Sequence, residues 1–163
     1  MTWLTPQSYA NDVETELTAV FIGRFASYVE WPASEHRYFV ITVLGENLFD
    51  SKLDQLYHNK QIKDKPVKVR YAATLNQVAR SDILFINLQT ASDRLSAIHF
   101  ARQHSMLSIS TARGFADNGG IIQLNIVEQK AQIKINHTAA LDSDLKIAAP
   151  LLSIATVLRK KQP

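Results

Sequence analysis

Two short runs of apolar residues place the strongest limit on how this chain can fold. Residues 38–44 read Tyr-Phe-Val-Ile-Thr-Val-Leu, and residues 83–86 read Ile-Leu-Phe-Ile. A strand with one solvated face alternates apolar and polar residues, so a run without alternation is typical of a strand buried on both faces. Such strands belong to parallel sheets, whose crossover connections are usually helices. The two runs therefore predict an α/β fold.

Helical periodicity separates the apolar runs. Apolar residues recur at helical spacing over residues 12–30, and Pro32 ends the pattern. A second helix is expected over residues 48–58. A third is expected to run to about Gln103, because Thr90 can cap its first turn. This order of strands and helices predicts right-handed crossovers between parallel strands.

The C-terminal third follows a different pattern. Residues 121–127 and 131–136 predict two antiparallel strands joined by a short turn, and Pro150 suits the first turn of a final helix that carries apolar residues as far as Leu158. We therefore expect one α/β domain over residues 11–160. Its mixed, largely parallel sheet is flanked by helices and followed by a C-terminal antiparallel hairpin plus helix.

Residues 1–10 are assigned separately. They have neither the basic nor the apolar region of a complete signal peptide, but Ser8-Tyr9-Ala10 is similar to the end of a cleavage site. They are expected to be a remnant of an export signal or a disordered tail.

Composition argues against several classes of function. The chain has 18 Lys and Arg against 15 Asp and Glu, a net charge of +3, and no strong basic cluster, so nucleic acid is not an expected partner. It has no cysteine, which excludes disulfides and thiolate metal sites. Its five histidines lack metal-site spacing, and the glycine-rich signatures of nucleotide sites are missing. We therefore predict no enzyme, no cofactor and no metal.

Three segments together resemble the YfiR-like family of bacterial proteins. Residues 21–32 place aromatic residues on a helix that closes on Trp-Pro. Residues 114–122 read Gly-Phe-Ala-x-x-Gly-Gly-Ile-Ile, and residues 135–140 read Ile-Asn-x-x-Ala-Ala. The resemblance extends from about Val13 to Leu158. It implies a periplasmic, non-catalytic α/β domain that forms a homodimer and whose N-terminal ten residues remain from an export signal.

The resemblance also implies a function. The family's namesake binds and represses the periplasmic sensor region of a membrane-bound diguanylate cyclase, which lowers cyclic di-GMP signalling and biofilm formation. Its redox response depends on cysteine pairs, which this chain lacks; Ser81 stands where a family cysteine is expected. Two alternatives are kept: a periplasmic sensor that binds an unknown small molecule, and a flavodoxin-like domain that binds a nucleotide or flavin.

Six residues are expected to bind the partner, because protein interfaces favour aromatic and arginine anchors among polar residues. They are Trp31, Arg113, Phe115, Asn136, His137 and Leu145. Structural roles compete with this assignment at three of them. Trp31 could hold the first helix on the sheet, Phe115 could close the core beneath its loop, and Asn136 could satisfy backbone groups of a turn.

Overall fold

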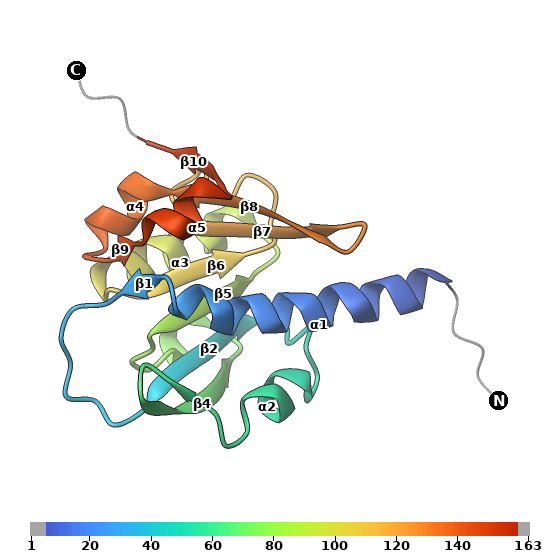
Figure 1. The fold of residues 1–163 in the computed structure, drawn as a ribbon, viewed down its shortest axis with the longest axis horizontal. Helices are drawn as coiled ribbons and strands as arrows, with labels where there is room; N and C mark the ends of the chain where they lie inside the picture. Colours follow the sequence, from blue (N-terminus) through green and yellow to red (C-terminus); the bar gives the residue numbers. More distant parts are fainter. Residues whose placement is uncertain (1–5, 160–163) are drawn as a thin grey trace.

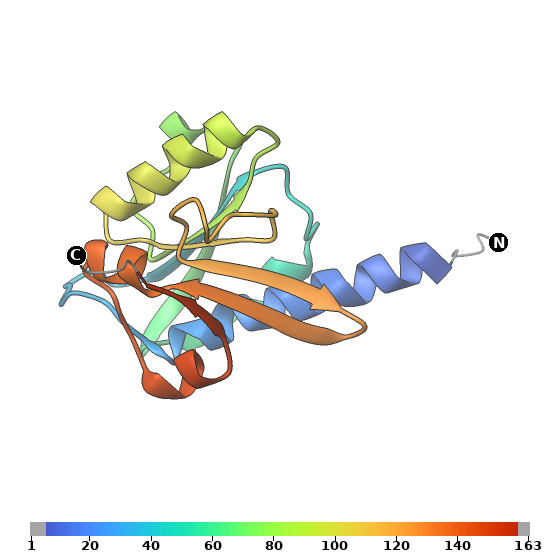
Figure 2. The same ribbon diagram turned by 90° about the horizontal axis from the view of Figure 1, so that it is seen from above.

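Helices cover both faces of one central sheet in the computed structural model, which describes residues 6–159 (Figures 1 and 2). The helices are α1 (Pro6–Ala26), α2 (Lys52–Tyr57), the 3-10 turn η1 (Leu75–Gln77), α3 (Ala91–Gln103), α4 (His137–Asp142) and α5 (Ala149–Ser153). The strands are β1 (Val29–Glu30), β2 (Phe39–Gly45), β3 (Gln61–Ile62), β4 (Lys65–Ala72), β5 (Ile83–Asn87), β6 (Leu107–Ser110), β7 (Ile122–Val127), β8 (Lys130–Asn136), β9 (Lys146–Ile147) and β10 (Thr156–Leu158).

Eight strands form the sheet in the order β10-β8-β7-β6-β5-β2-β4-β3, and β1 pairs with β9 in a separate two-stranded sheet. The pairs from β4 through β2, β5 and β6 to β7 are all parallel, whereas β7–β8 and β3–β4 are antiparallel. The five parallel strands follow the doubly wound order 2-1-3-4-5. The predicted α/β class with a mixed, largely parallel sheet is confirmed.

Each face of the sheet has its own core. On one face, α1 and α2 pack over inward residues of the central strands, such as Ile41 and Phe85. On the other, α3 packs over residues such as Leu84 and Ile86, and Figure 2 shows α1 and α3 on opposite sides of the sheet. Phe85 and its neighbours Leu84 and Ile86 point to opposite cores because side chains alternate along a strand. This two-sided burial confirms the strands predicted from the apolar runs.

The predicted first helix has the wrong ends. Helix α1 begins at Pro6 and ends at Ala26, not at residue 30. The chain leaves the helix because Val29 and Glu30 pair with Ile147 and Lys146. Val29 is buried by that pairing, so it fits the helical spacing without being helical. Residues 6–10 belong to α1, and residues 1–5 of the expected export remnant lie outside the described residues.

The predicted final helix is also wrong beyond its first turn. Helix α5 ends at Ser153, and the chain returns as β10, with Val157 beside Ile135 of β8 in parallel register. Ile154 was expected to pack inward but is 70% exposed. The strand forms because the edge of β8 carries backbone groups that need partners. Helix α2 is shorter than predicted, because residues 48–51 form a turn in which Asn47 Oδ1 accepts a hydrogen bond from Phe49.

Other sequence-based predictions are confirmed. Thr90 caps α3, accepting a 3.1 Å hydrogen bond from the Asp93 amide. Strands β7 and β8 form the predicted hairpin. Its two turn residues, Glu128 and Gln129, both adopt positive φ angles, which is the geometry of a tight two-residue hairpin turn.

Candidate functional site

The loop between β6 and β7 folds back into the protein rather than standing out from it. Phe115 is 2% exposed and belongs to the core beneath α3. A Cβ atom at Gly120 would lie 2.1 Å from the Phe115 ring, so only glycine leaves room for that ring. Phe115 therefore closes the core, as the structural alternative proposed, and its side chain is not on the surface.

Asn136 connects this loop to α4. Its Oδ1 accepts a 2.9 Å hydrogen bond from the Ala139 amide and thereby caps α4. Its Nδ2 donates a 2.9 Å hydrogen bond to the Ala116 carbonyl oxygen. Both polar ends of the side chain are therefore engaged with backbone, which is the structural role that competed with partner binding.

His137 lies next to this clamp and contacts the end of the chain. Its Nδ1 is 2.8 Å from Nη1 of Arg159. A guanidinium only donates, so Nδ1 is the acceptor and the ring is neutral with its proton on Nε2. Burial, followed by the charge of Arg159, lowers the pKa of His137.

A polar cavity of about 290 Å³ opens beside Asn136. Arg102 and Arg159 line it together with Asp117 and Asp142. The Nε atom of Arg102 is buried and has no hydrogen-bond partner among the described residues. Unpaired buried donors are uncommon, so this nitrogen is an exception among the described side chains.

The remaining predicted partner residues are dispersed. Arg113 is exposed at the start of the loop, whereas Leu145 is fully buried and packs with the α1-side core. Trp31 is half-buried; its Nε1 donates a 3.1 Å hydrogen bond to the Asp82 carbonyl oxygen, and its ring meets Phe39 edge-on at 5.3 Å. Asp82 directly precedes β5, so Trp31 lies at the amino ends of the parallel strands, whereas Arg113 follows the carboxyl end of β6.

Partner binding by the six residues therefore stays a prediction, and the structure limits how it could work. Arg113, His137 and Trp31 have accessible atoms. Phe115 and Leu145 have core positions that a partner could reach only by opening the fold.

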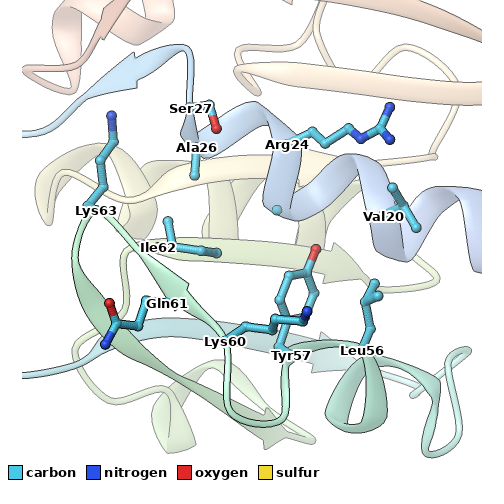
Figure 3. A pocket seen from close by; sticks show the side chains of 11 residues that line it. Val20, Arg24, Ala26, Ser27, Leu56, Tyr57, Lys60, Gln61, Ile62 and Lys63 are labelled. Atoms are coloured by element: carbon cyan, nitrogen blue, oxygen red, sulfur yellow. The ribbon is translucent and has the colours of Figure 1, made fainter.

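The sequence did not indicate a second cavity, of about 350 Å³, between the C-terminal half of α1 and the segment after α2 (Figure 3). Its back wall is the ring of Tyr57, whose hydroxyl donates a 2.7 Å hydrogen bond to the Ala19 carbonyl oxygen of α1. A Cβ atom at Gly23 would lie 2.1 Å from that hydroxyl oxygen. A glycine inside a strongly periodic helix was the one available signal of such a close approach. Burial raises the pKa of Tyr57 to about 12, so the phenol stays protonated.

Ser81, where the resemblance led us to expect a cysteine, forms a buried hydroxyl pair with Thr42. Ser81 is 3% exposed, its Oγ lies 2.5 Å from Oγ1 of Thr42, and it donates to the Ala79 carbonyl oxygen. The serine is therefore satisfied within the fold.

Two neighbouring strand ends are hydrogen-bonded to each other at the place where doubly wound folds bind ligands. That place lies at the carboxyl ends of β2 and β5, where the strand order reverses. Here the Glu46 amide donates to the Asn87 carbonyl oxygen at 3.3 Å, and Asn87 Nδ2 donates back to the Glu46 carbonyl oxygen at 2.7 Å. A Cβ atom at Gly45 would lie 2.1 Å from the Asn87 oxygen. These contacts hold the two strand ends close together.

Two kinds of feature were sought in the part of the chain that the structure describes. It has no group of three metal-ligating side chains placed to hold an ion. None of its helices combines the length and apolar character needed to cross a membrane.

Comparisons with known proteins agree with this fold. A family model described as YfiR/HmsC-like matches residues 15–156. No curated protein matches the sequence.

Solved structures share the architecture at low identity. A conserved domain protein from Vibrio cholerae O1 biovar El Tor strain N16961 is 17% identical, with a TM-score of 0.58 over 90% of this chain and 60% of that one. An ABC domain in complex with L-Trp from Streptococcus pneumoniae is 11% identical, with a TM-score of 0.57 over 89% of this chain and 60% of that one. This chain thus spans about 60% of the length of both proteins. At such identities the likeness shows the fold alone.

Proposed function

The chain belongs to the YfiR/HmsC-like family, and from that premise we propose that it binds the periplasmic sensor region of a membrane-bound diguanylate cyclase and represses the enzyme. Repression would lower cyclic di-GMP and restrain biofilm formation. Proteins of this family are in general periplasmic, non-catalytic regulators. The family match, which covers residues 15–156, is the observation that carries the proposal.

The partner surface that we propose is built around α4 and the loop that Asn136 clamps to it. His137 and Leu141 lie four residues apart and so share one face of α4. Leu141 is 53% exposed. Arg113 stands at the start of the clamped loop. An exposed leucine and a histidine on one helix face, with an arginine on the loop that Asn136 clamps, would give the mixed character of a protein-binding surface.

The polar cavity beside α4 supports the same placement. It has cationic and anionic side chains on its wall and an unpaired donor in Arg102. A carbonyl or carboxylate group of the partner could meet the charged side chains that line this cavity. In this proposal Phe115 acts from beneath the surface: it holds the loop in place and does not touch the partner.

The test is a binding measurement with matched variants. Arg113→Ala combined with Leu141→Ala should weaken binding to the purified sensor domain by about tenfold or more, because interface anchors dominate affinity. The control combines Arg70→Ala with Leu95→Ala, which removes an arginine and a leucine that are also exposed but lie on β4 and α3. It should bind within about twofold of the parent.

Two results would count against the proposal in different ways. If the parent chain does not bind the sensor domain of the cyclase in isothermal titration calorimetry, the function is wrong. If the parent binds and both double variants bind equally well, the function stands but the surface is misplaced. The proposal includes the homodimer that the resemblance implies, which light scattering of the purified chain would test.

A further inference from the structure

The cavity between α1 and the segment after α2 has a lining that selects a particular kind of ligand. Its walls are largely apolar and come from Val20, Leu56, Ile62 and the ring of Tyr57. Three cations belong to its lining, Arg24, Lys60 and Lys63, and no acidic residue does. The lining thus combines apolar walls with side chains whose charges are all positive.

Some cations among the described residues are paired with an acidic side chain, and others are not. Lys52, Lys134 and Arg80 each form an ion pair with an aspartate. The side chains of Lys60 and Lys63, by contrast, make no hydrogen bond or ion pair with another described residue. Figure 3 shows Lys60 extending beside the ring of Tyr57, whereas Lys63 lies at the opposite end of the cavity and points away from that ring, and Arg24 is directed away along α1. Lys60 is therefore the cation placed to meet the charge of a ligand that packs against Tyr57.

The backbone positions both lysines before any ligand arrives. The Lys60 amide donates to the Tyr57 carbonyl oxygen, and its carbonyl oxygen accepts from the Val67 amide, each at 3.1 Å. Lys63 sits in the two-residue turn that joins β3 to β4, where its φ is +54°. A preorganised backbone leaves only side-chain entropy to be lost on binding.

Tyr57 contributes a surface rather than a polar contact. Its hydroxyl proton is already donated to Ala19 of α1. The ring therefore offers an apolar wall, against which an aliphatic or aromatic group can pack.

We propose that this cavity is a binding site for a small organic anion, with its carboxylate or phosphate on Lys60, its apolar part against Tyr57, Leu56 and Ile62, and Lys63 adding positive charge at the opposite end of the lining. The volume of about 350 Å³ is at the small end of the range for small-molecule sites. An inorganic anion would leave the apolar wall uncovered, and an apolar molecule would leave the two lysines unpaired. The ligand must have both parts.

Three probes of similar shape test the charge requirement by calorimetry. They are 3-phenylpropionate, the neutral 3-phenylpropanamide and the cationic 3-phenylpropylamine. The anion should bind the parent chain about tenfold or more tightly than either of the others, and more tightly than inorganic phosphate. Its binding should shift the backbone amide resonances of Gly23 and Ile62 in a ¹⁵N spectrum.

Charge reversal tests the assignment of the lysines. Lys60→Glu with Lys63→Glu should weaken 3-phenylpropionate binding by about tenfold or more. The control, Lys130→Glu with Lys146→Glu, makes the same change in net charge at exposed positions on β8 and β9 and should bind like the parent. All four side chains are exposed, so these variants should keep the parent's circular dichroism spectrum.

Four results would overturn the proposal: absence of measurable 3-phenylpropionate binding, equal binding of the acid and its amide, binding of inorganic phosphate as tight as that of the acid, or equal loss of binding in both charge-reversal variants. None of these measurements involves a cyclase, so they test the ligand site independently of the proposed function.

Discussion

Helices pack on both faces of the sheet, but they pack more tightly on one face than on the other. On the α3 face, Ala97 and Ala101 are fully buried and let the helix approach the strands, and Phe115 fills the end of that layer. On the other face, α1 meets the segment after α2 through Gly23 and Tyr57, and the cavity opens beside that contact. The tight face fixes the loop of the proposed partner surface, whereas the open face has room for a ligand.

The largest loss of stability is expected from a cavity made in the core on the α3 face. Phe115→Ala should lower the free energy of unfolding by about 3–5 kcal/mol, because it leaves a cavity the size of a phenyl ring in the core beneath α3. Chemical denaturation followed by circular dichroism measures this loss. A loss below about 1 kcal/mol would mean that the loop collapses into the space and that this face is not tightly packed.

A smaller effect is expected at Trp31, on the other face. Its ring packs against Phe39 but is half-buried, so Trp31→Ala should cost about 2 kcal/mol rather than the larger loss typical of a fully buried tryptophan. Trp31→Phe should recover most of the packing but not the hydrogen bond to Asp82. A variant as stable as the parent would show that Trp31 does not hold β1 against the sheet, and its exposed atoms would become stronger candidates for partner binding.

The contact between α1 and Tyr57 should contribute less to the free energy of unfolding than Phe115 or Trp31. Tyr57→Phe removes only the hydroxyl that donates to the Ala19 carbonyl oxygen, and we expect a loss of about 1 kcal/mol in the free energy of unfolding. Amide hydrogen exchange should quicken in α1 near Gly23 and remain unchanged in α3. If amide exchange becomes faster by the same factor in α1 and α3, the helices on the two faces of the sheet respond together rather than separately.

The difference between local and long-range contacts explains which features the sequence could predict. Strands β2 and β5 are recognisable because burial on both faces requires consecutive apolar residues. The start of α3 is recognisable because its cap is a local hydrogen bond between Thr90 and Asp93. In each case the determining contact or burial pattern is written within a few residues of the chain.

The features that the sequence did not predict depend on distant partners. Val29 matches the helical spacing of α1, yet it is in β1 because Ile147 lies opposite it, 118 positions further along. Val157 pairs with Ile135 of β8 and so ends the expected last helix early. The cavity combines Lys60 and Lys63 with α1, and the sequence alone shows these lysines only as part of a basic stretch. From the sequence, Phe115 could either bind a partner at the surface or close the core beneath its loop. Its packing against Gly120 shows that the ring is in the core.

The smallest expected effect is a pH dependence at the edge of the proposed partner surface. Burial and the nearby Arg159 lower the pKa of His137 in the folded chain. The unfolded chain, with an ordinary histidine pKa near 6.5, then binds more protons at mildly acidic pH. The contribution of His137 to stability is therefore complete above the unfolded pKa and declines as the pH falls through 6.5 toward the lower folded value.

Thermal unfolding measured between pH 7.5 and pH 5 should reveal this contribution as a difference between variants. His137→Gln should lose less stability on acidification than the parent, because glutamine does not take up a proton. His58→Gln, at an exposed position on the loop after α2, serves as the control and should follow the parent curve. The difference should be small, since the ring is only partly buried and solvent screens its interaction with Arg159. If His137→Gln follows the parent across the whole range, Arg159 does not disfavour the protonated ring, and the contact between α4 and the end of the chain is looser than the 2.8 Å distance indicates.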